Sequence, residues 1–353
     1  MIIKVPLRLD IAGSYTDLPG YREKGGTHIN APLDYGVRIV STPTTEAVLW
    51  STPTRQDRGG LRSRRDGEAT KGAPLNAVVH KDDGWVRCVR STTPSTADIF
   101  SLSPPIASQT PQSPPKEGQD EFIEKMNFQV AQILNVPRVE LMSTCDIEHG
   151  SGLGASSATV VGIVQYYSEV YHLQLKPEEL ALFACKAIEQ TGICGRQDEF
   201  SAAFGCPVYL RYNKNCVSHE EITIVDTFEL PPEFRRNMET WKLLYRPRTI
   251  SCQEMLDHEM KANFNIEPIV QGTILMYNAI VNADWSNFYQ AYKAHWLFVE
   301  GQNPSKINAD IREIRRRYEG IYIRPCGAGA GGYLLIHGDV QGENIIDLKL
   351  KEN

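Results

Sequence analysis

Residues 150–158 read Gly-Ser-Gly-Leu-Gly-Ala-Ser-Ser-Ala, between a predicted strand at 139–145 and a predicted helix at 156–171. The three glycines let the backbone approach a ligand closely. The following helix points free N–H groups and the positive end of its dipole at the same place, which suits a phosphate. The segment is neither a P-loop, because no lysine follows, nor a dinucleotide fingerprint, and a tight strand-to-helix connection is the alternative. The predicted phosphate-binding residues are Gly150, Ser151, Gly152, Leu153, Gly154, Ala155, Ser156 and Ser157.

A second segment carries acidic residues. Residues 191–205 read TGICGRQDEFSAAFG, and Asp198 follows nine residues after Glu189, which ends a predicted helix at 177–189. Phosphoryl transfer to an alcohol needs a carboxylate near the hydroxyl and a group that holds magnesium on the nucleotide phosphates. Two acids on either side of a glycine-containing turn can supply both. The alternative is a surface acid that caps the next helix.

Two further segments have the composition of a binding site. In PLRLDIAGSYTDLP at 6–19, Arg8 lies in a predicted strand and Asp17 in the loop that follows. A short carboxylate in a loop can accept hydrogen bonds from sugar hydroxyls. The glycine-rich GAGAGG at 327–332 either permits close backbone approach to a ligand or lets two elements pack tightly.

The composition excludes several classes of protein. The chain has 353 residues, of which 41% are hydrophobic, so it can bury one large core or two smaller ones. A formal net charge of −6 argues against a nucleic-acid binder, and no apolar stretch approaches the roughly 20 residues of a membrane span. Arg8 and Asp10 would interrupt a signal peptide, so we expect a cytoplasmic protein. The eight cysteines are scattered without a CxxC pair, which favours reduced thiols over a structural zinc site.

The segment 42–118 differs in composition from the rest of the chain. Sixteen of the 28 residues from 91 to 118 are Pro, Ser or Thr, too polar to offset the entropy of ordering. We expect a loop or disordered insertion, with a phosphate-attracting arginine patch at 55–65 as the alternative. Elsewhere the hydrophobic pattern predicts strands at 2–12, 37–40, 139–145, 241–245 and 333–337, and helices at 121–134, 156–171, 177–189, 267–281, 285–298 and 307–318.

These segments occur in the order and approximate spacing of the GHMP kinase family, which the chain resembles over about residues 1–40 and 120–340. The nearest resemblance is to the sugar-1-kinase branch of D-glycero-D-manno-heptose 7-phosphate kinase and L-fucose kinase. It rests on PLRLDIAGSYTDLP, on GRQDEFSAAFG at 195–205, on Arg248 in PRTIS and on Trp296. The resemblance implies an α+β, two-lobed GHMP kinase fold. Its N-terminal lobe, resembling ribosomal protein S5 domain 2, would span 1–212, and its ferredoxin-like C-terminal lobe 213–353.

The resemblance also implies roles for individual residues. Asp198 would face the sugar hydroxyl as catalytic base or orienting group, and Arg8 would depress the acceptor's pKa and neutralise charge on the phosphoryl group. Ser156 and Glu189 match the usual magnesium ligands, with Ser157 as the competing hydroxyl. Residues 150–157 would line the nucleotide phosphates. The substrate-binding residues would be Asp17 and Gly329.

The predicted function is an ATP- and Mg2+-dependent sugar kinase that phosphorylates a sugar or sugar-phosphate hydroxyl, with the anomeric C1 hydroxyl as the expected acceptor. No nucleic acid or membrane partner is expected, and a homodimer is compatible with the sequence. The alternative is a catalytically degenerate relative that binds sugar or nucleotide as a sensor. Glu148 beside the expected polyphosphate and the unmatched segment 42–118 favour that alternative. An enzyme acting on an isoprenoid or amino-acid alcohol is disfavoured by GRQDEF at 195–200.

Overall fold

A computed structural model describes residues 1–41, 77–79, 86–88, 119–148, 150–214, 223–338, 340–342 and 344–352. The predicted insertion at 42–118 lies almost wholly outside these residues. Within it, two three-residue strands, β3 (Ala77–Val79) and β4 (Val86–Cys88), pair antiparallel. In the described part of the chain, no helix combines the length and the apolar character that crossing a bilayer requires.

The larger sheet is antiparallel and centres on one long strand, β2 (Thr27–Ser41). Strand β1 (Ile2–Ala12) pairs along one edge of β2, with irregularities between Pro6 and Arg8 and between Asp10 and Ala12. The other edge of β2 is shared, because its two halves pair with different strands. These partners are β5 (Leu141–Cys145) and β6 (Val208–Tyr212), and β7 (Thr223–Thr227) pairs with β6.

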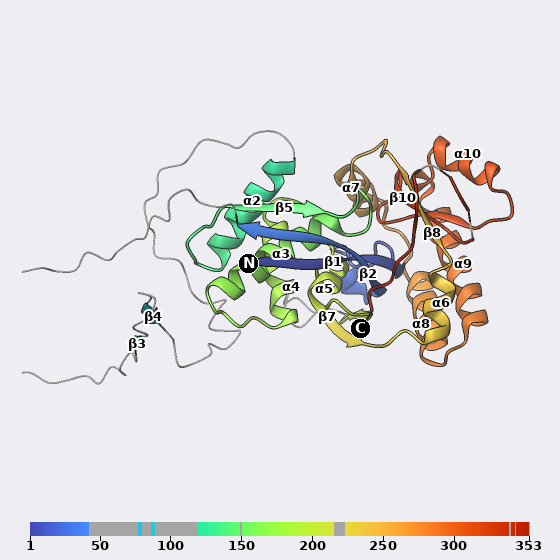
Figure 1. Cartoon of the computed structure of the whole chain (residues 1–353). Helices are drawn as coiled ribbons and strands as arrows, with labels where there is room; N and C mark the ends of the chain where they lie inside the picture. The colour runs from blue at the N-terminus through green and yellow to red at the C-terminus, as the bar shows by residue number, and fades with distance from the viewer. Residues whose placement is uncertain are drawn as a thin grey trace, which may run out of the picture. The chain divides into compact units, whose positions relative to one another are not determined.

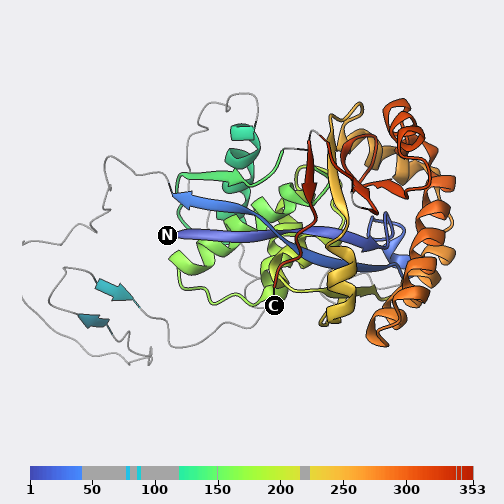
Figure 2. The ribbon, with the colours of Figure 1, turned by 45° about the vertical axis from the view of Figure 1, so that its right-hand side comes forward.

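The smaller sheet is also antiparallel, with strand order β11-β8-β10-β9. Its members are β8 (Lys242–Arg246), β9 (Ile323–Pro325), β10 (Gly332–Ile336) and β11 (Ile345–Asp347). Helices and antiparallel sheets both contribute to the described part of the chain, so the predicted α+β class is confirmed. Figures 1 and 2 show the helices against the two sheets. The helices are α2 (Gln119–Ile133), α3 (Ala155–Val170), α4 (Pro177–Glu189), α5 (Gln197–Phe204), α6 (Pro232–Met238), α7 (Cys252–Ala262), α8 (Glu267–Val281), α9 (Trp285–Gln302) and α10 (Ala309–Arg317), with 3-10 turns η1 (Arg22–Lys24) and η2 (Pro304–Lys306).

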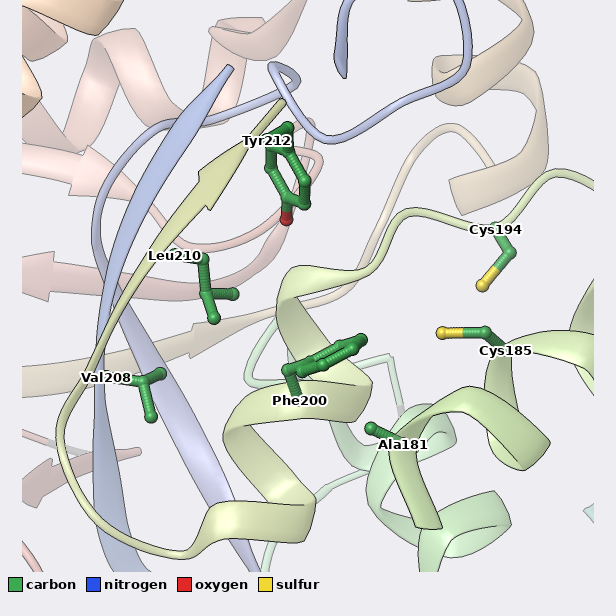
Figure 3. Close-up of a cluster of buried hydrophobic side chains, with 7 residues drawn as sticks. All are labelled: Ala181, Cys185, Cys194, Phe200, Val208, Leu210 and Tyr212. Atoms are coloured by element: carbon green, nitrogen blue, oxygen red, sulfur yellow. The ribbon is translucent and has the colours of Figure 1, made fainter. Parts of the chain in front are cut away.

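Helix α3 is the central helix of the larger sheet, and most of its residues are buried against β1 and β2. Its close approach depends on Gly162, where an added Cβ would lie 2.7 Å from Ile39 Cγ1. Helix α4 runs beside α3 and begins, as predicted, with a proline and two glutamates in its first turn. A buried apolar cluster joins α4, α5 and β6 (Figure 3). Its members are Ala181, Cys185, Cys194, Phe200, Val208, Leu210 and Tyr212.

The last residues of the chain return from the smaller sheet to the larger one. Leu350 forms a bridge with Leu33, and the backbone N–H of Asp34 donates to the carbonyl of Lys349. The backbone N–H of Lys351 donates to the carbonyl of Pro32. The described residues at 1–41 and from 119 onward belong to one compact unit, and the lobe boundary at 212/213 stays a prediction.

Candidate active site

The four segments singled out in the sequence meet at one cavity of about 380 Å³. Arg8 and Asp17 line it from the first segment, and Gly150–Gly152 with Gly154–Ser157 line it from the glycine-rich turn. Asp198 lies in the lining, as does Gly327 from the last segment. Leu153, Glu189 and Gly329 are not lining residues of this cavity.

The glycine-rich turn has the backbone conformation that glycine favours. Gly150, Gly152 and Gly154 have φ values of +71°, +78° and +77°, where a side chain is strained. A Cβ on Gly152 would also lie 2.5 Å from the carbonyl oxygen of Cys326. Helix α3 begins directly afterwards at Ala155, so its first N–H groups face the cavity lining. The turn thus combines glycines at positive φ with a helix start in the cavity lining, as a phosphate site requires, and its role as a phosphate site stays a prediction.

Arg8 joins the turn to the acidic segment. Its backbone N–H donates to the carbonyl of Leu153 at 3.0 Å, and its Nη1 donates to the carbonyl of Gly152 at 3.3 Å. Its Nε and Nη2 both lie 2.6 Å from Asp198 Oδ1. Arg8 is buried, which disfavours its charge, but the Asp198 carboxylate raises the pKa of Arg8 above its ordinary value. The guanidinium therefore stays charged beside Asp198.

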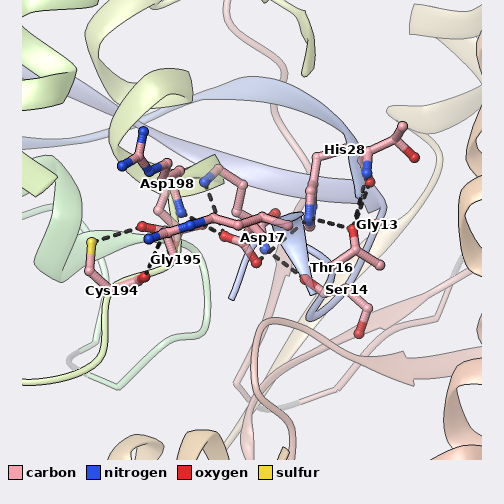
Figure 4. Close-up of polar contacts among 12 residues, drawn as sticks. Gly13, Ser14, Thr16, Asp17, His28, Cys194, Gly195 and Asp198 are labelled. Carbon is pink, nitrogen blue, oxygen red and sulfur yellow. Dashed lines mark hydrogen bonds and ion pairs between the residues drawn. The ribbon is translucent and has the colours of Figure 1, made fainter. Parts of the chain in front are cut away.

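Asp17 is buried and holds the start of the helix that carries Asp198 (Figure 4). Its Oδ2 accepts hydrogen bonds from the backbone N–H groups of Arg196 at 2.8 Å and Gln197 at 3.1 Å. Burial raises the pKa of Asp17, although these two N–H groups act in the opposite direction. The structure therefore gives Asp17 a positioning contact with α5, in addition to its place in the cavity lining.

The residues proposed as metal ligands have different surroundings. Ser156 is exposed and lines the cavity, whereas Glu189 Oε1 lies 3.7 Å from Arg22 Nη2 outside the lining. Ser157 is buried, and its hydroxyl donates to Glu199 Oε1 at 2.6 Å. Burial, with the nearby charge of Asp198, raises the pKa of Glu199 to about 8.

Arg248, in the motif PRTIS, lies between the two glycine-rich segments. In the structure its Nε donates to the carbonyl of Gly150 at 2.8 Å and its Nη1 to the carbonyl of Gly329 at 2.7 Å. It thus connects the two glycine-rich segments, and this is how Gly329 meets the site. No local pattern predicts this contact, since its partners are backbone atoms 98 and 81 residues away.

Two further contacts depend on the fold alone. Lys306, buried in the lining, pairs with the buried Glu259 at 2.7 Å. The Tyr333 hydroxyl of β10 donates to Glu148 Oε2, and Glu148 is not part of the cavity lining. The carboxylate that sequence places beside the expected polyphosphate is therefore tied to the smaller sheet.

Residues 121–206 match the family model described as the GHMP kinases N terminal domain. The chain carries a GHMP kinase N-terminal domain. Within this domain lie the glycine-rich turn, Ser156, Ser157, Glu189 and Asp198, and the predicted resemblance to the family is confirmed.

Two curated kinases share sequence with the chain beyond the GHMP kinase N-terminal domain. D-glycero-alpha-D-manno-heptose 7-phosphate kinase of Campylobacter jejuni is 28% identical over 212 residues, which are 55% of this chain and 59% of that protein. Mevalonate kinase of Saccharolobus solfataricus is 26% identical over 218 residues, which are 59% of this chain and 64% of that protein. The chain therefore aligns with about three fifths of the length of these relatives.

The fold is similar to that of solved GHMP kinase structures. A D-glycero-D-manno-heptose 1-phosphate kinase from Bacteriodes thetaiotaomicron superposes with a TM-score of 0.59 at 16% identity. The superposition covers 99% of this chain and 96% of that chain. The likeness confirms the GHMP kinase fold that the sequence resemblance implies.

Proposed function

We propose that this protein is an ATP- and magnesium-dependent sugar kinase, which transfers the γ-phosphoryl group to a hydroxyl of a sugar or sugar phosphate, with the C1 hydroxyl as acceptor. One observation supports it most strongly. The Arg8–Asp198 ion pair, at 2.6 Å, lines the same cavity as the glycine cradle at the start of α3. This arrangement supports the proposal, because phosphoryl transfer to an alcohol needs a carboxylate beside the phosphates.

In this proposal the nucleotide phosphates bind along the turn at Gly150–Gly154, at the positive end of α3. Asp198 orients the acceptor hydroxyl and accepts its proton as the hydroxyl oxygen bonds to the γ-phosphorus and ADP leaves. Arg8 holds Asp198 in place through their ion pair and offsets negative charge on the phosphoryl group during transfer. Asp17 fixes the first turn of α5 and so the position of Asp198.

The cavity lining near the start of α3 offers oxygen atoms of the kind that magnesium prefers. Mg2+ prefers oxygen donors such as hydroxyls and carboxylates, and it usually keeps several waters. Ser156 and Asp198 offer such oxygens in the cavity lining, and Glu189 follows the lining residue Ile188. The proposed Mg2+ ligands are Ser156, in the lining, and Glu189, which lies outside the lining beside Arg22. The ion would offset phosphate charge when bound.

The test is ADP release from ATP and Mg2+ across a panel of acceptors: fucose, arabinose, mannose, heptose 7-phosphate and mevalonate. We expect release that depends on a sugar and falls by about 100-fold or more in Asp198→Asn. Asp226→Asn is the matched control, because Asp226 also pairs with an arginine, Arg211, at 2.7 Å but lies in β7 outside the cavity lining.

If mevalonate alone stimulates ADP release, the acceptor is an isoprenoid alcohol and not a sugar. If no acceptor stimulates ADP release, the proposal that the protein is a kinase is wrong. Calorimetric titration with a non-hydrolysable ATP analogue would then show whether the chain binds nucleotide without turning it over.

A further inference from the structure

Beside the cavity, the fold gathers three ligand-type side chains that phosphoryl transfer does not use. The sulfur atoms of Cys185 and Cys194 and a carboxylate oxygen of Glu199 all lie within 4.8 Å of one another, and all three residues are buried. Figure 3 shows the two sulfur atoms pointing toward each other across the gap between the end of α4 and the following loop. The three residues come from three successive elements: α4, the loop before α5, and the first turn of α5.

We propose that Cys185, Cys194 and Glu199 are the ligands of a single thiophilic divalent cation, and that this cation is Zn2+. Two thiolates and one carboxylate are a donor set that Zn2+ accepts, and thiolate donors select it over Mg2+. Two sulfurs bound to one Zn2+ at about 2.3 Å each lie about 3.8 Å apart in tetrahedral geometry. The three side chains therefore need to approach by about 1 Å at most.

A second observation points to a ligand here. Glu199 is 3% exposed, and its Oε1 accepts the Ser157 hydroxyl at 2.6 Å. Its other oxygen, Oε2, is buried without a hydrogen-bond partner. A buried carboxylate oxygen without a donor is costly. A cation held jointly with the two thiolates would satisfy this oxygen and leave the bond to Ser157 in place.

The cavity gives the ion a route to the site. Cys194 and Glu199 both line the cavity, as do Ile193 and Gly195 on either side of Cys194. An ion that enters with water from the cavity meets these two residues before Cys185, which does not line the cavity. The fourth coordination position would face the cavity and hold a water molecule.

Zinc binding at this site would affect the proposed kinase. Glu199 is adjacent in sequence to Asp198, and its Oε1 is bound to Ser157 at the start of α3. An ion that draws Glu199 toward the thiolates would shift the first turn of α5 and with it the Arg8–Asp198 pair. We expect Zn2+ to inhibit, and this consequence rests on the proposed function, whereas the binding itself does not.

The test uses Co2+ as a spectroscopic probe for Zn2+, with the full-length reduced protein in excess Mg2+. The excess Mg2+ occupies oxygen-donor sites, so the Co2+ that binds reports on the thiol site. We expect one Co2+ per chain, with sulfur-to-cobalt charge-transfer absorption in the near ultraviolet, and displacement of Co2+ by Zn2+. Cys185→Ser and Cys194→Ser should each lower the Co2+ affinity by about 100-fold or more, since even the loss of an outer-shell partner costs about 10- to 100-fold.

The matched control is Cys206→Ser. Cys206 packs against the same apolar cluster, but its thiol is outside the three-residue group, so its loss should leave the absorption unchanged. Glu199→Gln keeps the two thiols and the shape of the side chain, and should weaken Co2+ binding while the charge-transfer absorption persists at saturation. Cys185→Ala and Cys194→Ala serve as a second pair of variants if the serine variants do not fold.

Two results would overturn the proposal. One is the absence of charge-transfer absorption in the unmodified protein at saturating Co2+. The other is absorption that survives substitution of both Cys185 and Cys194, which would place the metal on other cysteines. Neither result depends on kinase turnover, so a failed zinc site and a failed kinase assignment are distinguishable.

Discussion

Arg8 Nε donates to Asp198 Oδ1 at 2.6 Å, although the two residues are 190 positions apart in the chain. The contact forms where an irregularity in β1 meets the first turn of α5. The same guanidinium reaches the carbonyl of Gly152. One buried side chain therefore connects the predicted acceptor site to the predicted phosphate cradle.

This geometry predicts that Arg8→Lys is not a conservative change. A lysine ammonium is a compact point charge that cannot reproduce the guanidinium fork between Asp198 and Gly152. Losing one charged hydrogen bond costs about 2 kcal/mol, so kcat/KM for the sugar-dependent reaction should fall by about 30-fold. Steady-state kinetics with the acceptor that the panel identifies measures this decrease in kcat/KM. Arg211→Lys, in an exposed pair with Asp226, is the control, and an equal loss there would count against a special role for Arg8.

Substitution of Gly152 should destabilise the protein. In Gly152→Ala the new Cβ would lie 2.5 Å from the Cys326 carbonyl oxygen, at a φ of +78°. We expect a loss of about 2 kcal/mol in the free energy of unfolding, together with weaker nucleotide binding. Urea denaturation and titration with an ATP analogue measure the two effects. Gly301→Ala is the control, since a Cβ added at Gly301 has no neighbouring atom within 4 Å. Equal stabilities of the two variants would contradict the prediction.

Arg248 should matter for nucleotide binding more than for folding. Arg248→Gln removes the link between the carbonyls of Gly150 and Gly329, so the two glycine-rich segments lose a shared partner. We expect the KM for ATP to rise by about tenfold, corresponding to about 1.4 kcal/mol, with a change of less than about 1 kcal/mol in stability. Arg312→Gln removes a comparable bond to the Ile307 carbonyl outside the cavity lining. A KM that changes equally in both variants would refute the assignment.

The stability of the protein should fall in acid partly through His337. Burial, with the nearby charges of Arg324 and Lys293, lowers the pKa of His337 from its ordinary value of 6.5 to about 2. Between these values the unfolded chain binds the proton and the folded chain does not. The free energy of unfolding therefore decreases as the pH falls from about 6.5 toward 2, by about 1.4 kcal/mol per pH unit for one fully titrating site.

The variant His337→Phe isolates this effect. Phenylalanine keeps a ring stacked on Trp241, whose centroid lies 3.7 Å from that of His337, but it cannot bind a proton. Urea denaturation between pH 4 and 6 gives the slope of the unfolding free energy against pH. This slope should decrease by about 1.4 kcal/mol per pH unit, which corresponds to one proton. His258→Phe, at an exposed position, is the control. An unchanged slope for His337→Phe would mean that the folded protein already protonates this ring.

Local patterns in the sequence predicted many of the elements. Helices α4 and α8 and strand β1 begin and end where the hydrophobic pattern places them. Strand β2 is longer than the predicted 37–40, because it begins at Thr27. Its first half carries Pro32 and Asp34, residues that are rare in strands and hide the pattern. The pairing of this half with β1 and β6 stabilises it despite those residues.

The candidate site divides in the same way. Glycines at 150, 152 and 154 followed by a helix predict a phosphate cradle from adjacent residues alone. The contacts of Arg248, the contact of Glu148 with Tyr333 and the cap that Asp17 places on α5 join residues 81 to 185 positions apart. No local pattern contains such pairs.

The sequence by itself determined the α+β class, the four segments and their resemblance to GHMP kinases, because each depends on residue types at short, fixed spacing. The tertiary structure decided which polar groups meet. It brought Arg8 to Asp198 and placed Glu199, Cys185 and Cys194 together, where the cysteine spacing had disfavoured a zinc site. The physical reason is that contacts between distant residues are fixed by the packing of the helices on the sheet, in which a buried charge or thiol has the neighbours that the whole core allows.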